Sequence, residues 1–252
     1  LDPAPAQLRA VDELLATHPA DAVLTESMFL GAMLLLSRPA AERPPVINLG
    51  IIPLGLRSRD TAPFALGIPP RPGSVGRARN ALLTWSTDRF VFGDLQRAAA
   101  RQVRDIVGAE LRTPVMNYPS LADAVVQFSV PEFEYPRTDV RTPVHFVGPV
   151  SLADASSIPV PDWWGDLDAD RPVVHVTQGT VANADLNDLV LPTIDALADR
   201  DVLVVATTGG RELPRRPLPA NARMAAYLPY DRLFPRTSVL VTNGGYGGVH
   251  YA

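Results

Sequence analysis

The sequence predicts an α/β fold made of two domains, each with a parallel sheet. Short apolar runs alternate with amphipathic helical segments through the first 150 residues, and the alternation restarts after residue 171. Between these parts, residues 151–171 are rich in Pro, Ser and Asp, a composition typical of a linker. We therefore predict a first domain over 1–150, a linker over 151–171 and a second domain over 172–252.

The first part predicts two early helices, four strands and one long later helix. Apolar residues at helical spacing predict a helix over 3–17, and a second apolar helix is expected after Glu26 and Ser27, through about residue 37. Short apolar runs predict strands over 21–25, 46–49, 124–129 and 144–148. Residues 50–85 lose any period and predict a long loop region, followed by an amphipathic helix over 88–108.

The second part repeats the alternation of strand and helix. Strands are expected over 172–177, 202–206 and 238–242, with a helix over 183–199. Pro192 lies inside that helical segment, and it predicts a kink or a later start because proline lacks the backbone donor. Two such halves joined by a linker predict two Rossmann-like domains.

Composition excludes several classes of chemistry. The 252 residues contain no Cys, which excludes disulfides, thiolate metal sites and cysteine nucleophiles. All 23 basic residues are Arg, which excludes a Walker lysine and a lysine Schiff base. The net charge of −4 and the scattered Arg residues argue against a nucleic-acid partner. The longest apolar run, Met28 to Leu36, is about half of a membrane span, so we expect a cytoplasmic protein without a span.

Small polar residues follow three strands of the second part. In an open parallel sheet, ligands bind at the carboxyl ends of strands, so these loops predict one shared site. The alternative interpretation is that Gly and Thr merely form tight turns. After the last strand, glycines open a predicted helix, where backbone N–H groups and the helix dipole favour an anion such as phosphate. The loops are Thr177 to Thr180, Thr207 to Gly210 and Thr242 to Gly245.

These segments resemble a known family. Val173 to Thr180 is a strand with a Gly-Thr loop, Tyr227 to Tyr230 is an aromatic-x-Pro segment, and Val241 to Ala252 is glycine-rich. Together they resemble the donor half of family 1 glycosyltransferases of the GT-B fold, in particular bacterial macrolide-type enzymes. Asp21 to Ala32 and Phe128 to Pro149 resemble parts of the other half. The resemblance covers only the middle of the family pattern, so we expect an internal segment with both domains incomplete.

The resemblance implies a nucleotide-sugar donor site for UDP or dTDP. Thr180 would contact the donor phosphates, Tyr227 would stack on the nucleobase, and the Leu228 backbone would meet the base edge. The alternative for Tyr227 is an ordinary half-buried ring. The remaining donor-binding residues implied are Gly179, Asn243, Gly244, Gly245, Gly247 and Gly248.

Three of the family's donor positions differ in this sequence. Asn243 stands where the family has His, Gly248 where it has Thr, and Tyr251 where it has a ribose-binding Glu. Asn still donates a hydrogen bond to a phosphate, whereas Tyr cannot chelate two ribose hydroxyls as a carboxylate does.

The resemblance also implies catalytic and acceptor residues in the first domain. Glu26 occupies the place of the acidic residue that orients a base His, and none of the four His residues matches the base itself. We therefore expect the base outside this chain and the segment alone to be inactive. The alternative for Glu26 is a charge favoured at a helix N-terminus. Phe29 and Phe64 are candidates for an apolar acceptor pocket, although core packing explains them equally well.

The expected function is an inverting glycosyltransferase that moves a sugar from a UDP- or dTDP-sugar to a hydroxyl of a small, largely apolar acceptor. The resemblance implies no metal and no other cofactor, and the aspartates of the predicted linker are expected to be solvated. One alternative is a non-catalytic nucleotide-sugar-binding or auxiliary subunit of the same fold. Another is a nicotinamide oxidoreductase, which the absence of a Gly-x-Gly-x-x-Gly fingerprint disfavours. The sequence predicts no oligomeric state.

Overall fold

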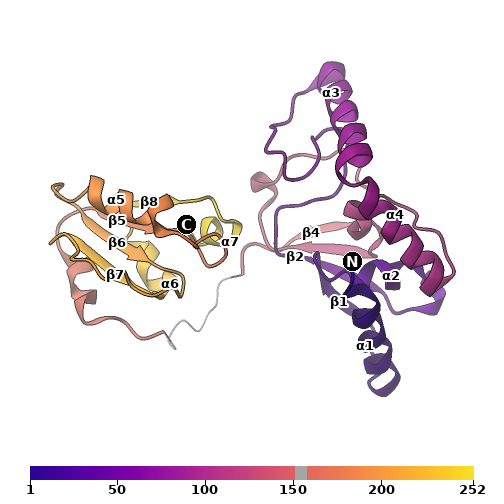
Figure 1. The fold of residues 1–252 in the computed structure, drawn as a ribbon, viewed down its shortest axis with the longest axis horizontal. Helices are drawn as coiled ribbons and strands as arrows, with labels where there is room; N and C mark the ends of the chain where they lie inside the picture. The colour runs from indigo at the N-terminus through magenta and orange to yellow at the C-terminus, as the bar shows by residue number, and fades with distance from the viewer. Residues whose placement is uncertain (151–157) are drawn as a thin grey trace. The chain divides into compact units, whose positions relative to one another are not determined.

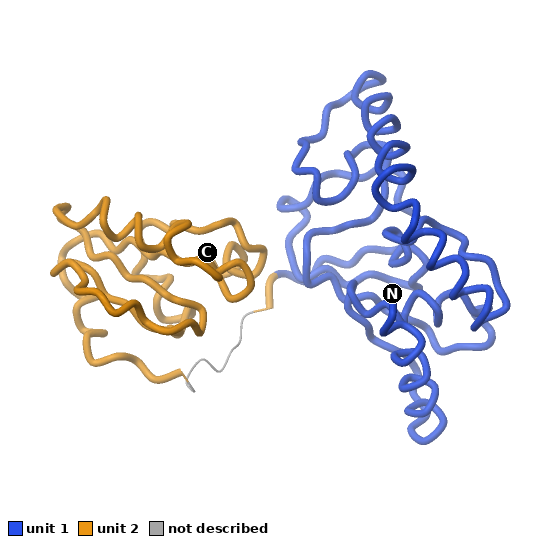
Figure 2. Tube along the Cα trace, viewed as in Figure 1, with its two compact units in different colours: residues 1–148 blue, residues 149–252 orange. Residues whose placement is uncertain are grey.

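The computed structural model describes residues 1–150 and 158–252. The chain divides into two compact units, Leu1–Gly148 and Pro149–Ala252 (Figure 2). The predicted boundary at residue 150 lies two residues from the boundary between the units.

Unit 1 is built on a four-stranded parallel sheet in the order β1-β2-β3-β4 (Figure 1). Parallel strands are expected where short apolar runs are separated by crossover segments. The four strands lie within the four predicted segments or end one residue beyond them, which confirms this part of the prediction. They are β1 Val23–Glu26, β2 Val46–Gly50, β3 Ala124–Gln127 and β4 Val144–Phe146.

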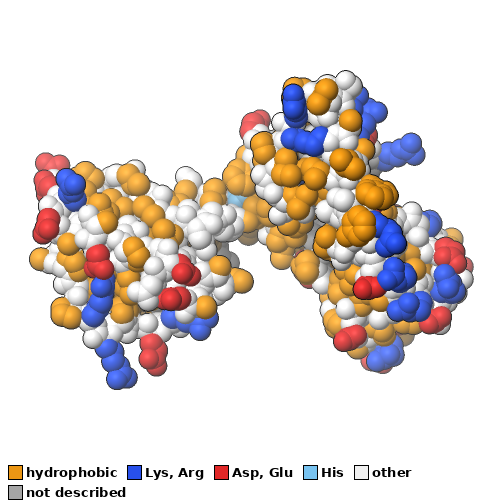
Figure 3. Space-filling view, turned by 45° about the horizontal axis from the view of Figure 1, so that its top comes forward, with side chains coloured by type: hydrophobic (Ala, Val, Ile, Leu, Met, Phe, Trp, Pro, Cys, Tyr) orange, Lys and Arg blue, Asp and Glu red, His pale blue; other side chains and the backbone are white. Residues whose placement is uncertain are grey.

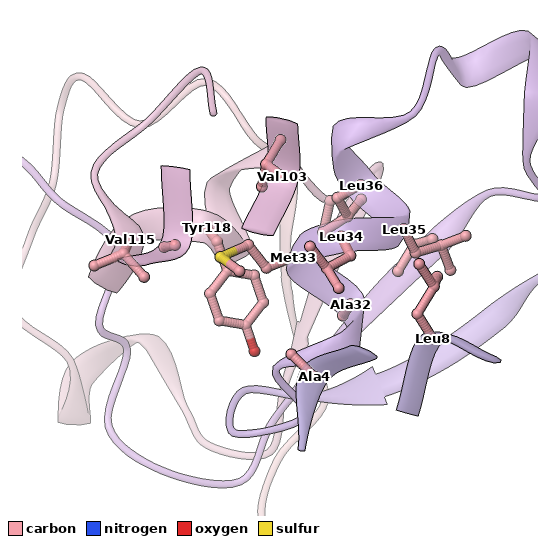
Figure 4. Packing of buried hydrophobic residues seen from close by; sticks show 13 residues of the cluster. Ala4, Leu8, Ala32, Met33, Leu34, Leu35, Leu36, Val103, Val115 and Tyr118 are labelled. Atoms are coloured by element: carbon pink, nitrogen blue, oxygen red, sulfur yellow. The ribbon is translucent and has the colours of Figure 1, made fainter. Parts of the chain in front are cut away.

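The core of unit 1 forms where the first two helices pack together. Helix α1 spans Ala4–Thr17 and α2 spans Gly31–Ser37, and every residue of α2 is buried. Figure 4 shows Leu8 of α1 beside side chains of α2, with Tyr118 from a 3-10 helix, Val115–Leu121, on the other side. Two further short 3-10 helices cover Ala40–Glu42 and Pro131–Phe133.

The region from residue 73 to 107 differs from the prediction. Helix α3 spans Gly73–Ser86, inside the segment predicted to be a loop. The predicted helix over 88–108 is a π-helical turn, Thr87–Val91, then α4, Gly93–Gln102, then a second π-helical turn, Val103–Val107.

Helix α3 escaped prediction because its large apolar side chains face outward. Val75, Leu82 and Trp85 are all more than half exposed, so no buried stripe marks the helix in the sequence. Figure 3 shows hydrophobic side chains gathered on the surface of unit 1 around this region.

Unit 2 holds a second four-stranded parallel sheet, in the order β7-β6-β5-β8. Strand β5, Val173–Thr177, and strand β6, Leu203–Thr207, are fully buried, as central parallel strands are. Strand β8, Val239–Thr242, was also predicted. The short strand β7, Ala222–Ala225, was missed, since its sequence Ala-Arg-Met-Ala has no β-branched residue.

The helices of unit 2 are short. Helix α5 spans Val190–Ala196, so Pro192 is its third residue and the later start is confirmed. The others are α6, Tyr230–Leu233, and α7, Tyr246–Tyr251, with 3-10 turns over Leu186–Asp188 and Phe234–Arg236. Among the described residues, no helix combines the length and apolar character needed to cross a bilayer.

The predicted linker is partly wrong. Residues 151–157 lie outside the described residues, but Asp162–Asp168 is a 3-10 helix that belongs to unit 2. Trp164 is buried in one core cluster with Leu203. Asp166 pairs with Arg223 at 2.6 Å, so this aspartate is tied to the sheet and is not a solvated linker charge.

Candidate functional site

A cavity of about 390 Å³ opens at the carboxyl ends of strands β5, β6 and β8 in unit 2. The three strands are parallel and adjacent, with Thr177 paired to Thr207 and to Thr242 in register. The loops that follow them therefore meet at one edge of the sheet. This confirms the predicted convergence of the three loops. The residues lining the cavity include Thr177, Thr180, Thr207, Tyr227, Tyr230 and Asn243.

Three hydroxyl groups form a network on the floor of this cavity. The Thr207 hydroxyl donates to the Thr177 hydroxyl at 2.8 Å, and the Tyr230 hydroxyl lies 3.3 Å from the same oxygen. Both threonines end buried strands, which fixes their position. The sequence analysis did not assign Tyr230 a role, although its place after Tyr227-Leu228-Pro229 was a usable signal.

The loops after β5 and β6 touch each other through backbone and amide groups. A Cβ added to Gly209 would lie 2.0 Å from the Gly179 carbonyl oxygen, so only glycine allows this approach. The Asn183 amide donates to the carbonyls of Thr208 and Gly209 at 2.9 and 3.2 Å. Asn183 therefore joins the two loops, and the helix predicted from residue 183 begins only at Val190.

Asn243 ties the third loop to the first. Its amide nitrogen donates to the Gln178 carbonyl at 2.9 Å, and its oxygen accepts from the Gly245 backbone at 3.3 Å. Gly244 has a φ of 77°, which favours glycine at this turn. The loop is thus shaped before α7 begins.

The predicted donor residues fall mostly at this cavity. Tyr227 is 54% exposed and its hydroxyl donates to the Gly209 carbonyl at 3.3 Å, so its ring stands at the opening. The Leu228 side chain is buried in the core, which leaves only its backbone for a ligand. Gly244 and Gly247 belong to the same segment but do not line the cavity. The predicted residues that do line it are Gly179, Thr180, Tyr227, Leu228, Asn243, Gly245 and Gly248.

Aromatic rings occupy the side of the cavity near α7. Tyr251 meets the Tyr230 ring edge-on at 5.5 Å and stacks parallel to Phe234 at 6.3 Å between centroids. The position where the family has a ribose-binding carboxylate is therefore part of an aromatic cluster. Asp231 is the one acidic side chain lining the cavity among the described residues.

His175 lies beneath the cavity and is fully buried. Its Nδ1 is 2.9 Å from the Val205 carbonyl, and its ring packs edge-on against Tyr230 and Phe234. Burial lowers the pKa of His175 to about 4, which keeps the imidazole neutral at physiological pH. This histidine is therefore a core residue.

In unit 1, Glu26 ends strand β1, and its side chain bonds the chain that follows. Its Oε2 accepts from the Met28 backbone at 2.6 Å. The Tyr118 hydroxyl donates to the carbonyls of Ser27 and Phe29 at 2.7 and 3.3 Å. Burial raises the pKa of Tyr118, and the negative charge of Glu26 raises it further. The loop carrying Glu26 is thus held from both sides.

The two predicted acceptor residues lie at different cavities of unit 1. Phe64 lines a largely apolar cavity of about 580 Å³ together with Phe92 and Met116. Phe29 lines a separate cavity of about 430 Å³ that also contains Glu26 and His18. The structure does not bring Phe29 and Phe64 together. Among the described residues, no three His, Asp or Glu side chains cluster as metal ligands would.

The sequence is similar to those of proteins named as sugar transferases and as a synthase. No family model matches it. It is 46% identical over 255 residues to 4'-demethylrebeccamycin synthase of Lentzea aerocolonigenes, covering 100% of this chain and 59% of that protein. It is 34% identical over 280 residues to the UDP-glucosyltransferase avaP of Aspergillus versicolor, covering 100% of this chain and 60% of the relative. The chain thus spans about three fifths of the relatives it matches.

Solved structures show the same arrangement of elements. The glycosyltransferase of kitacinnamycin matches with a TM-score of 0.68 and 18% identity, over 99% of this chain and 59% of that one. The calicheamicin glycosyltransferase CalG4 matches with a TM-score of 0.64 and 21% identity, over 97% and 57%. The glycosyltransferase VinC, solved in complex with dTDP, matches with a TM-score of 0.56 and 19% identity, over 98% and 54%. The chain therefore has the GT-B fold, as predicted, and its sequence is similar over its whole length to proteins named as a 4'-demethylrebeccamycin synthase and a UDP-glucosyltransferase.

Proposed function

We propose that the protein containing this chain is an inverting glycosyltransferase. It moves a sugar from a nucleotide diphosphate sugar to a hydroxyl of a small, largely apolar acceptor. The observation that carries this proposal is the convergence of three Gly- and Thr-containing loops on one cavity beside an exposed aromatic ring. Backbone N–H groups and hydroxyls suit a diphosphate, while the ring of Tyr227 suits a nucleobase face.

The donor in this proposal is a dTDP- or UDP-sugar. Its phosphates lie against Thr180 and the glycine-rich turn, and its base stacks on Tyr227. The relatives named as UDP-glucosyltransferases and the dTDP complex of VinC support this choice. No metal takes part, because backbone donors supply the charge stabilisation.

The proposed reaction is a single displacement. The acceptor oxygen attacks the anomeric carbon of the sugar while the bond from that carbon to the diphosphate oxygen breaks, and the configuration inverts. A base takes the proton of the acceptor hydroxyl, and backbone N–H groups of the donor loops stabilise the negative charge that develops on the nucleoside diphosphate. Glu26 is proposed to hold a base histidine that this chain does not supply, with its own loop fixed by Tyr118.

A second candidate is a nucleotide-sugar-binding subunit without transferase activity. It is favoured by Tyr251, which packs against Tyr230 where the family has a carboxylate. Both candidates require nucleoside diphosphate binding, and only the first requires transfer.

Calorimetry with dTDP and UDP on the 252-residue chain tests the shared part. Thr180→Ala should weaken binding by roughly 1 to 3 kcal/mol, since one hydrogen bond to a charged group is lost. Thr17→Ala, an exposed change in unit 1, is the matched control and should leave affinity unchanged. Equal affinities of the Thr180 variant and the wild type would refute the assignment. Sugar transfer by the longest reading frame containing this chain would then separate the enzyme from the binding subunit.

A further inference from the structure

Two apolar cavities of unit 1 meet at the loop between β2 and α3. The larger has about 580 Å³ and the smaller about 200 Å³. They share five lining residues and are therefore neighbouring chambers with a common wall. The shared residues are Gly55, Leu56, Phe64, Val115 and Met116.

Only two side chains of this wall are able to move without opening the core. Leu56 and Val115 are each 3% exposed, whereas Phe64 is 44% and Met116 is 46% exposed. Methionine adapts its shape readily because it is unbranched and has three rotatable bonds. Phe64 and Met116 therefore form the movable part of the wall.

The Phe64 ring is placed by its surroundings. A Cβ added to Gly55 would lie 3.6 Å from the ring, so the ring rests on backbone that carries no side chain. The next residue, Ala65, has a φ of 70° and is the one non-glycine residue with positive φ in the described parts of the chain. This conformation is disfavoured for alanine, and such strained residues cluster at ligand sites.

The loop has a fixed base and a lightly held tip. At the base, the Arg57 backbone donates to Asn117 at 2.8 Å, and the Asn80 amide donates to the Arg59 carbonyl at 3.0 Å. At the tip, residues 62–66 make one backbone hydrogen bond in the described structure, between the Leu66 N–H and the Pro63 carbonyl, at 3.4 Å. Phe64 can therefore turn while the rest of the loop stays in place.

We propose that Phe64 sets the size of the acceptor that unit 1 accepts. With Met116 it separates the two chambers, and an apolar acceptor that is longer than the larger chamber extends into the smaller by displacing the Phe64 ring. The larger chamber lies within the usual range for small-molecule sites and the smaller lies below it, so the smaller serves as an extension. This inference rests on the proposed function, since it takes unit 1 as the acceptor side.

Fluorescence titration of the 252-residue chain with 2-naphthol and 1-hydroxypyrene tests the proposal. Both probes are smaller in volume than the larger chamber, but the four-ring plane of the second is longer, so only the second is expected to extend past the Phe64 ring into the smaller chamber. Phe64→Ala should raise the affinity for 1-hydroxypyrene about tenfold and leave that for 2-naphthol within about twofold. Phe64→Leu should act in the same direction and more weakly. Phe90→Ala, which removes a 72% exposed ring outside both chambers, should change neither affinity.

Three outcomes would overturn the proposal. If Phe64→Ala lowers the affinity for both probes equally, the ring is a binding surface and not a barrier. If both affinities stay unchanged, the ring does not separate the chambers. If neither probe binds, the chambers are not a ligand site. Unfolding temperatures confirm that each variant is folded. Binding of dTDP is measured separately, at unit 2. If Phe64 does not control probe binding but dTDP still binds, only this inference fails. If dTDP does not bind, the proposed transferase function fails.

Discussion

Replacing Gly209 by Ala tests whether the loops of the donor cavity depend on close backbone contact. The residue has a φ of 61°, and an added Cβ would lie 2.0 Å from the Gly179 carbonyl oxygen and 2.7 Å from the Asn183 amide nitrogen. The left-handed conformation alone costs alanine about 1 to 2 kcal/mol. The clash involves backbone, so the loops must move apart. Losing the two Asn183 hydrogen bonds adds about 1 kcal/mol each, giving about 3 to 4 kcal/mol in total.

Gly244→Ala is the matched control. Its φ of 77° brings the same conformational cost, but an added Cβ would meet nothing within 4 Å. We expect this variant to lose only about 1 to 2 kcal/mol of unfolding free energy. The difference between the two variants isolates the contact between the loops.

Urea unfolding of unit 2 measures both variants. The chain has three tryptophans, and a Trp85→Phe background leaves only Trp163 and Trp164, both in unit 2, as reporters. If Gly209→Ala and Gly244→Ala destabilise unit 2 equally, the close approach of the loops contributes nothing and the reasoning fails. Calorimetry with dTDP on the folded variants should show the weaker binding in Gly209→Ala, since its loops are displaced.

Two further predictions concern buried groups. Burial lowers the pKa of His175 from 6.5 to about 4. Below pH 6.5 the unfolded chain therefore binds a proton that the folded chain does not bind. This difference in proton binding should reduce the unfolding free energy of unit 2 by about 3 kcal/mol between pH 6.5 and 4. In urea titrations at several pH values, the loss of unfolding free energy on acidification should be smaller in His175→Gln than in the wild type. It should stay the same in the control His145→Gln. Tyr118→Phe removes two hydrogen bonds to the loop after Glu26. Amide hydrogen exchange of residues 27–31 should then be about fivefold faster, which corresponds to about 1 kcal/mol. The control Tyr135→Phe should leave these exchange rates unchanged. An unchanged exchange rate in Tyr118→Phe would mean that the phenol does not hold that loop.

The sequence predicted the sheets well because parallel strands leave a strong local signal. Strands β5 and β6 are buried along their whole length, and they read as continuous apolar runs. Strand β7 lacks that signal because Arg223 interrupts it to pair with Asp166 across 57 positions. Helix α3 was not predicted because its large apolar residues are exposed, so their spacing does not mark a buried face.

From the residues alone, without the family resemblance, the candidate site was predictable only near strand ends. A loop that directly follows a parallel strand has its place fixed by the sheet, and the loops with Thr180, Asn243 and Gly245 were found in this way. Tyr251 reaches the same cavity from the far end of α7, and its packing on Tyr230 depends on tertiary contacts that no spacing reveals. Phe29 and Phe64 were grouped only because both are apolar and lie in the first half, and the structure separates them.

In the proposed function, the donor cavity of unit 2 and the two chambers of unit 1 recognise ligands by different means, and this difference follows from how each is built. The cavity of unit 2 lies on strand ends and tight loops, where backbone groups hold a fixed geometry that suits the invariant diphosphate of any nucleotide sugar. The chambers of unit 1 lie under a loop whose tip is lightly held, with Phe64 and Met116 exposed at their wall. Changes at such a tip alter the shape of the pocket without disturbing the sheet. Substitutions at Phe64 are therefore expected to change which acceptors bind, while dTDP affinity at unit 2 stays constant.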